Sequence, residues 1–107
     1  MHWEAVNVDT NLTIGDRKVA ISVSRPIRWK LPVSDHLSVH PGDNDIWVWK
    51  VNSFAAGGPL QIVPPDGGRL LMGGSVLPVN QAVTIPTGKM AVLVPTGLLH
   101  FAISILD

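Results

Sequence analysis

The 107-residue chain contains no cysteine and no tyrosine, and only 15% of its residues are charged. The absence of cysteine excludes disulfides and thiolate metal sites, so stability must come from packing or assembly. Eight basic residues balance eight acidic ones, and this balance leaves no net field to attract nucleic acid or an anionic membrane. No apolar run approaches the roughly 20 residues that span a bilayer, and the N-terminus lacks the regions of a signal peptide. We expect neither a nucleic-acid nor a membrane partner, and synthesis in the cytoplasm.

Helical periodicity is also missing from the chain. Nine prolines and ten glycines interrupt it, and no window between them places apolar residues at the spacing of a helix face. Apolar residues alternate instead at period two, which is typical of strands. The alternating segments are Val6–Val8, Val19–Val23, Ile46–Val51, Leu60–Ile62, Val83–Ile85, Met90–Val94 and Phe101–Ile105.

Turn sequences rich in glycine and proline separate these segments at short intervals. They include Pro41-Gly42 and two Pro-Thr-Gly turns, which begin at Pro86 and Pro95 and bound one strand. The pattern predicts an all-β fold, a compact antiparallel β-sandwich or small barrel. We expect a single domain, with an N-terminal arm and the first strands in residues 1–28 and the main β domain in residues 29–107.

Two predicted strands are apolar on both of their faces. Ile46–Val51 places two tryptophans, Trp47 and Trp49, on the face opposite Ile46 and Val48. The C-terminal strand behaves similarly, because Phe101, Ile103 and Ile105 face one way and Ala102, Ser104 and Leu106 the other. A monomeric sandwich would leave one face of such a strand in water. With 46% hydrophobic residues in the chain, we expect part of this surface to lie against another subunit.

The order of strands and turns resembles the small β domains of bacteriophage tail fibres and other virion proteins. The matching elements are Leu31-Pro32, Pro41-Gly42, Ile46–Val51, Leu60–Ile62, Pro65-Asp66-Gly67-Gly68 and Gly73-Gly74. Trp47 and Trp49 are bulkier than is usual in that family, and the chain lacks the long extensions of a complete fibre. A compact chain of this size is more similar to a capsid-decorating or cement protein, and such proteins are commonly homotrimers.

The resemblance implies a non-enzymatic virion protein that trimerises and binds the major capsid protein, or another virion protein, at the capsid surface. Such a protein would be made in the cytoplasm of the phage's host. Two alternatives stay open: a tail, collar or fibre-base component, and a carbohydrate-binding module that uses exposed tryptophans. The residues expected at a subunit or capsid interface are Trp3, Arg25, Arg28, Trp29, Trp47, Trp49, Phe101 and Ile103.

Patterns for catalysis or metal binding are weak. His36 and His40 would lie roughly 13 Å apart on a strand, too far for one ion. Asp43-Asn44-Asp45 lacks the downstream carboxylate of a calcium loop and is more typical of an Asx turn. No nucleophile motif and no pair of carboxylates spaced for acid–base chemistry is present. We therefore expect no catalytic residue, no metal and no cofactor.

Residues 25–30 form a short basic stretch. Arg25, Arg28 and Lys30 surround Trp29, a composition that also occurs in proteins that bind single-stranded nucleic acid. The neutral chain argues against that role, and basic residues commonly protect strand edges. Because Pro26 favours an extended backbone, we expect this stretch to contact an acidic patch on a partner protein.

Overall fold

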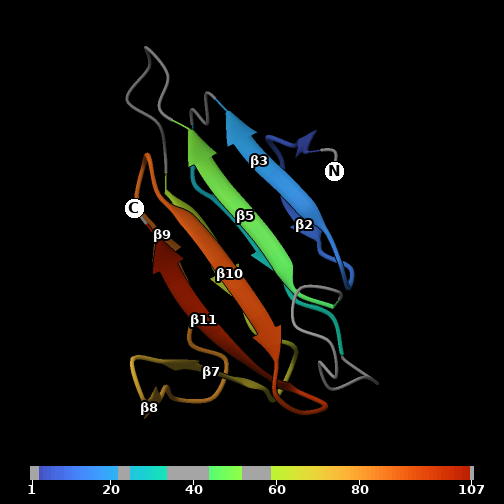
Figure 1. Cartoon of the computed structure of the whole chain (residues 1–107), viewed down its shortest axis with the longest axis vertical. Coiled ribbons are helices and arrows are strands. Elements are labelled where there is room, and N and C mark those ends of the chain that lie inside the picture. Colours follow the sequence, from blue (N-terminus) through green and yellow to red (C-terminus); the bar gives the residue numbers. More distant parts are fainter. Residues whose placement is uncertain (1–2, 22–24, 34–43, 52–58, 107) are drawn as a thin grey trace.

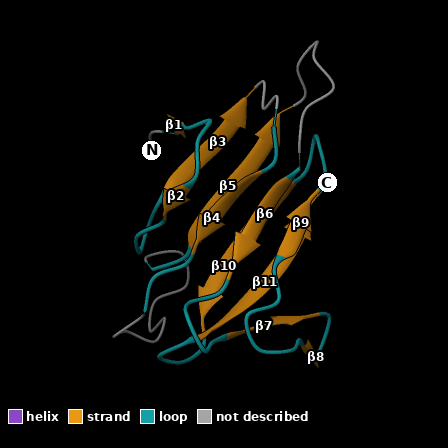
Figure 2. Cartoon of the chain, turned by 180° about the vertical axis from the view of Figure 1, so that it is seen from behind, coloured by secondary structure: helices purple, strands orange, loops and turns teal. Residues whose placement is uncertain are grey.

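The computed structural model describes residues 3–21, 25–33, 44–51 and 59–106. Within these ranges the chain forms strands and no helix, as the sequence predicted (Figures 1 and 2). Accordingly, no helix in the described ranges could cross a membrane.

The strands form two sheets that face each other across a shared core, with sheet A in front in Figure 1. Sheet A has the order β1 (Glu4–Ala5), β3 (Arg17–Ile21), β5 (Ile46–Val51), β10 (Met90–Pro95), β11 (His100–Leu106), β7 (Arg69–Met72) and β8 (Ser75–Val76). Sheet B has the order β2 (Thr10–Asn11), β4 (Ile27–Lys30), β6 (Leu60–Val63) and β9 (Val83–Ile85).

The first six strands alternate between the two sheets along the chain. Odd-numbered strands join sheet A and even-numbered strands join sheet B, so the chain returns to each sheet in the same direction. As a result β1, β3 and β5 are parallel neighbours, and so are β2, β4 and β6. The expected antiparallel sandwich was wrong on this point, because both sheets are mixed. Antiparallel pairing is confined to β5, β10 and β11, to β6 and β9, and to β7 and β8 among the described strands.

Alternate residues of each main strand point into the core. Trp29 is the largest fully buried side chain, and its indole Nε1 donates a hydrogen bond to the Val8 carbonyl at 2.9 Å. A buried indole N–H needs such a partner, so this bond lets the ring fill the core without leaving a polar atom unsatisfied. The remaining core side chains are Leu12, Ala20, Ile27, Leu31, Ile46, Val48, Leu60, Ile62, Leu70, Val83, Ile85, Ala91, Leu93, Phe101 and Ile103.

Two lysines also point inward, at the margins of the core. The Lys18 ammonium lies 3.2 Å from a carboxylate oxygen of Glu4 and 3.8 Å from one of Asp16. The Lys50 ammonium donates to the Thr87 hydroxyl at 3.3 Å. Buried charges need polar partners of this kind. The Glu4 contact therefore helps to hold β1 against β3.

The N-terminal segment lies along the body in its described part. Val6 N–H donates to the Val19 carbonyl at 3.0 Å, and Leu12 N–H donates to the Lys30 carbonyl at 2.7 Å. Leu12 is itself a core residue, 2% exposed. Within residues 3–13 the N-terminal segment is thus paired with both sheets. A strand at Val6–Val8 was wrong, because the pairing residues are Glu4–Ala5 and Thr10–Asn11.

The buried tryptophan gives the first test of the fold. Trp29→Ala should lower the free energy of unfolding by about 3–5 kcal/mol, because it opens a cavity between the sheets. Trp49→Ala is the matched control: this ring is 39% exposed, and its loss should cost about 1 kcal/mol. Urea denaturation followed by circular dichroism measures both values. Similar losses at the two positions would contradict the assignment of Trp29 to the core.

Gly68 gives a second test, because it lies where two backbone segments meet. Its N–H donates to the Pro65 carbonyl at 2.7 Å, and the next N–H, from Arg69, donates to the Leu99 carbonyl at 3.3 Å. A Cβ at position 68 would collide with the Leu99 carbonyl oxygen and lie 2.9 Å from that of Pro65. Both obstacles are backbone atoms, which cannot move aside without loss of these hydrogen bonds.

Gly68→Ala should therefore destabilise the protein by about 2–3 kcal/mol, the cost of overpacking at a rigid site. Gly97→Ala is the control, because an added Cβ there would lie 3.4 Å from its nearest neighbour, His100 Nδ1. That change should stay within about 0.5 kcal/mol. Thermal or urea unfolding of the two variants tests the difference, and equal stabilities would refute the close approach at Gly68.

Candidate functional site

Most outward-facing side chains on the described strands of sheet A are apolar, and the polar ones are Arg17, Ser104 and the paired Arg69 and His100. Cross-strand register arranges them in rows that run from β1 and β3 to β11 and β8, and we call these rows the apolar face. Trp49, Val76 and Leu106 are its most exposed large side chains, at 39%, 56% and 41%. The rows are Ala5, Val19, Trp49, Met90 and Leu106; Arg17, Trp47, Val92 and Ser104; and Val94, Ala102, Leu71 and Val76.

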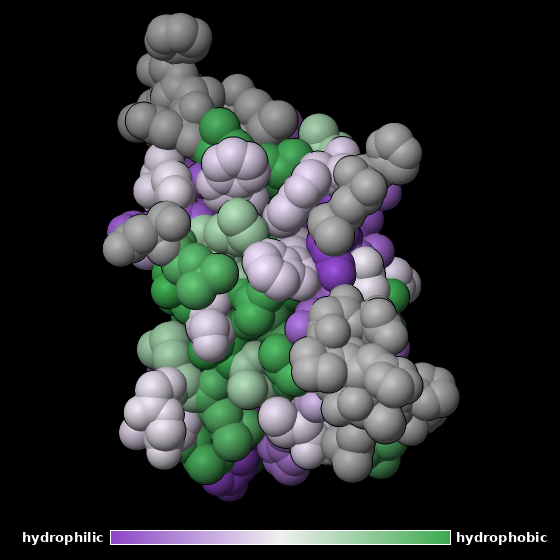
Figure 3. All heavy atoms as spheres, in the orientation of Figure 1, coloured by the Kyte–Doolittle hydropathy of each residue, from purple (hydrophilic) through white to green (hydrophobic). Residues whose placement is uncertain are grey.

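Figure 3 looks onto this face and shows apolar side chains along its length. An antiparallel or mixed sheet with one solvated face normally alternates polar and apolar residues. The apolar face departs from that pattern over several adjacent strands. Contiguous exposed apolar surface is a common feature of binding sites, which makes this face the candidate site.

The outer face of sheet B has the opposite character. Its rows contain Arg28, Gln61 and Thr84, followed by Asn11, Lys30 and Val63. Most of these side chains are polar and suited to water. The chain therefore has one apolar and one polar outer face, and the apolar one is the candidate docking site.

Three of the four tryptophans gather at the β1–β3–β5 side of the apolar face. Trp3 packs edge-on against Trp49, with ring centroids 6.2 Å apart and an interplanar angle of 68°. The Arg17 guanidinium lies 5.6 Å from the centre of the Trp47 ring. These contacts use ring surface that a sugar-stacking platform would leave free. They favour a packed aromatic patch over the carbohydrate-binding alternative.

Arg17 is the cation in the central rows of the apolar face, and the backbone holds it in place. Its Nη1 donates to the carbonyl oxygens of Gly15 at 3.1 Å and Asp16 at 3.0 Å, and also to that of Asp45. These bonds bind the guanidinium across the turn before β3 and the start of β5. These bonds fix the position of the guanidinium, while its positive charge stays at one side of the apolar face.

The predicted interface residues divide among three places. Trp3, Trp47 and Trp49 lie together on the apolar face, whereas Arg25 and Arg28 lie on the side of sheet B. Trp29, Phe101 and Ile103 are core residues, at most 3% exposed. The prediction that these three side chains lie at a surface contact was therefore wrong. Each occupies an inward position of its strand, so the packing of the two sheets covers it.

The sequence interpretation overlooked several residues of the apolar face. Leu71 and Val76 belong to strands β7 and β8, whose short length hides their alternation. Val92 and Met90 lie on β10, where every residue is apolar and periodicity cannot tell inside from outside. The only available signal was the two-sided apolar character of β5 and β11. That signal predicted an apolar outer surface but did not show which other strands contribute to it.

No group of three or more histidine, aspartate or glutamate side chains within the described ranges is placed to hold a metal ion. His36, His40 and Asp43 lie outside those ranges. Asp45 is 7% exposed, and its carbonyl contacts Arg17 at the start of β5.

Comparison with protein-family models, with characterised proteins and with solved structures gives no match for this chain.

The Trp3–Trp49 contact predicts energetic coupling between β1 and β5. In a double-mutant cycle with Trp3→Ala and Trp49→Ala, the coupling energy should be about 0.5–1.5 kcal/mol, the usual value for an edge-to-face pair. Urea denaturation of the wild type, both single variants and the double variant gives this number. Additive losses would show that the two rings do not support each other in solution.

Proposed function

We propose that this protein is a non-enzymatic structural subunit that self-associates through the apolar face and mounts on a larger protein shell. The bacteriophage capsid is the setting that the sequence resemblance implies, with three copies arranged around an axis and their apolar faces turned inward. The observation that carries the proposal is the continuous apolar surface over sheet A, beside the polar surface over sheet B.

A second copy of the chain is the occupant that the surface chemistry favours. The central rows of the apolar face contain no carboxylate, and their one cation, Arg17, is bound by backbone carbonyls. Apart from Arg17, the central rows bring no charged side chain to a contact between two such faces. The chain as a whole has no net charge, so long-range repulsion does not keep copies apart either.

The size of the apolar face explains why a shell would be needed as well. From strand spacing and residue rise, the three rows cover roughly 20 Å by 15 Å, or about 300 Å² of projected area per copy. Stable complexes bury about 1,200–2,000 Å² in total, so contact between copies alone should be weak. A shell that presents several binding sites raises the effective concentration and stabilises the assembly through multivalency.

Self-association can be measured directly in solution. The average mass of the wild type should rise with concentration in the micromolar to millimolar range, towards that of three chains, because apolar faces meet. Trp49→Arg places a charge in the middle of the face and should weaken association by roughly tenfold or more. Sedimentation velocity or light scattering gives both results.

Thr84→Arg is the matched control, because Thr84 is exposed on the outer face of sheet B. It adds the same charge on the opposite side and should leave association unchanged. A wild type that remains monomeric throughout would overturn the proposal. A dimer would agree with association through the apolar face but would exclude the trimer. Purified virions that lack the chain would exclude the capsid role.

A further inference from the structure

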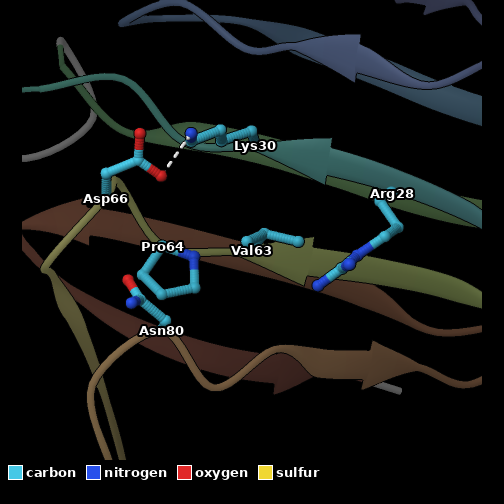
Figure 4. A pocket seen from close by; sticks show the side chains of 6 residues that line it. All are labelled: Arg28, Lys30, Val63, Pro64, Asp66 and Asn80. Carbon is cyan, nitrogen blue, oxygen red and sulfur yellow. Dashed lines mark hydrogen bonds and ion pairs between the residues drawn. The ribbon is translucent and has the colours of Figure 1, made fainter.

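A surface hollow lies on the outer side of sheet B, away from the apolar face. It has a volume of about 440 Å³ and is lined by Arg28, Lys30, Val63, Pro64, Asp66 and Asn80 (Figure 4). This volume is within the range of pockets that take small organic ligands. Strand β4, strand β6 and the loops after β6 and β8 all contribute, so the hollow is built from segments distant in sequence.

One end of the hollow holds a cation with no counter-charge. The Arg28 guanidinium makes no hydrogen bond or ion pair with any residue in the described part of the chain, whereas the backbone N–H of Arg28 donates to Asp9 Oδ1 at 3.0 Å. The backbone is thus fixed while the side chain stays available. A guanidinium in this state is suited to a planar anion such as a carboxylate, which it binds through two parallel hydrogen bonds.

The other end holds an ion pair, in which Lys30 Nζ lies 2.6 Å from Asp66 Oδ1. In Figure 4 these two side chains point toward each other, and Val63 and Pro64 lie between them and Arg28. With two cations and one carboxylate, the hollow has one positive charge in excess. The second oxygen of Asp66 remains available as an acceptor.

Asn80 contributes an amide whose position is fixed. Its Oδ1 accepts a hydrogen bond from Gly67 N–H at 2.8 Å, and the backbone N–H of Asn80 donates to the Gly68 carbonyl at 2.9 Å. The amide NH₂ group is left as a donor at the edge of the hollow. The walls therefore offer a guanidinium, an amide donor, a carboxylate acceptor and an apolar floor of valine and proline.

We propose that this hollow binds a saccharide that carries a carboxylate group. Arg28 binds the carboxylate, Asp66 and Asn80 bind ring hydroxyls, and a face of the sugar ring with its C–H groups packs on Pro64 and Val63. A simple inorganic anion would gain nothing from the apolar floor and would be repelled by Asp66. A sugar acid uses all of these groups together, and the site is independent of association through sheet A.

Titration with glucuronic acid and glucose tests this site, because the two sugars share a ring and differ in the carboxylate. Amide chemical shifts measured by NMR should move around β4, Asp66 and Asn80 with glucuronate. Glucose should bind roughly tenfold more weakly, because it lacks the charge-assisted bonds to Arg28. Arg28→Ala should remove the preference for glucuronate, whereas Arg69→Ala, which changes an exposed arginine on the other sheet, should keep it.

Several outcomes would overturn the assignment. Glucuronate that causes no shifts at millimolar concentrations would exclude the site, and acetate that binds as tightly as glucuronate would exclude a role for the sugar ring. Equal losses in Arg28→Ala and Arg69→Ala would show non-specific attraction. Tighter binding of an oligoglutamate peptide at the same amides would show that the hollow recognises an acidic protein segment instead. Unfolding curves of both variants confirm that they are folded, and the concentration dependence of the mass reports separately on self-association.

Discussion

Burial of one apolar core between two sheets determines which side chains of the described strands point outward. Each main strand gives alternate residues to the core, and the residues between them must face outward. Once Ile46 and Val48 enter the core, Trp47 and Trp49 have to lie outside it. The apolar face is thus a direct result of strands, above all β5 and β10, that carry apolar residues on their outward as well as their inward side. The polar face of sheet B follows from the same rule, because Arg28 and Lys30 flank the buried Trp29.

Period-two alternation was sufficient to predict most strands and the absence of helix in the described ranges. Alternation did not identify strand β4. The charges of Arg28 and Lys30 suggested a binding role there, although the alternate residues Ile27 and Trp29 are buried. Strand direction could not be predicted either. Whether neighbouring strands are parallel depends on which sheet each successive segment joins, and that choice is made by packing between distant segments rather than by local sequence.

Some predicted interface residues are buried and others are exposed, and this difference also depends on which side of each strand faces the core. Composition identifies tryptophan, arginine and phenylalanine as frequent contact residues, but it cannot tell which side of a strand meets the core. Trp29 and Trp49 have the same side chain and opposite positions, one fully buried with its N–H satisfied by Val8 and the other 39% exposed. The sequence supports an outer aromatic surface at Trp47 and Trp49, whereas Trp29 and Phe101 needed the fold to assign them.

In the proposed assembly, one outer face of the protein would be buried and the other would stay accessible to solvent. Copies that associate through the apolar face of sheet A bury the tryptophans and turn sheet B outward. The hollow beside Arg28 lies on sheet B, so association would leave it open and repeat it once per subunit. Weak binding of one sugar acid per subunit would then add up over the assembly, because ligands on a common surface bind as a multivalent set. Under these two proposals, self-association would strengthen binding to a surface that carries many sugar acids, without any contact between the two sites.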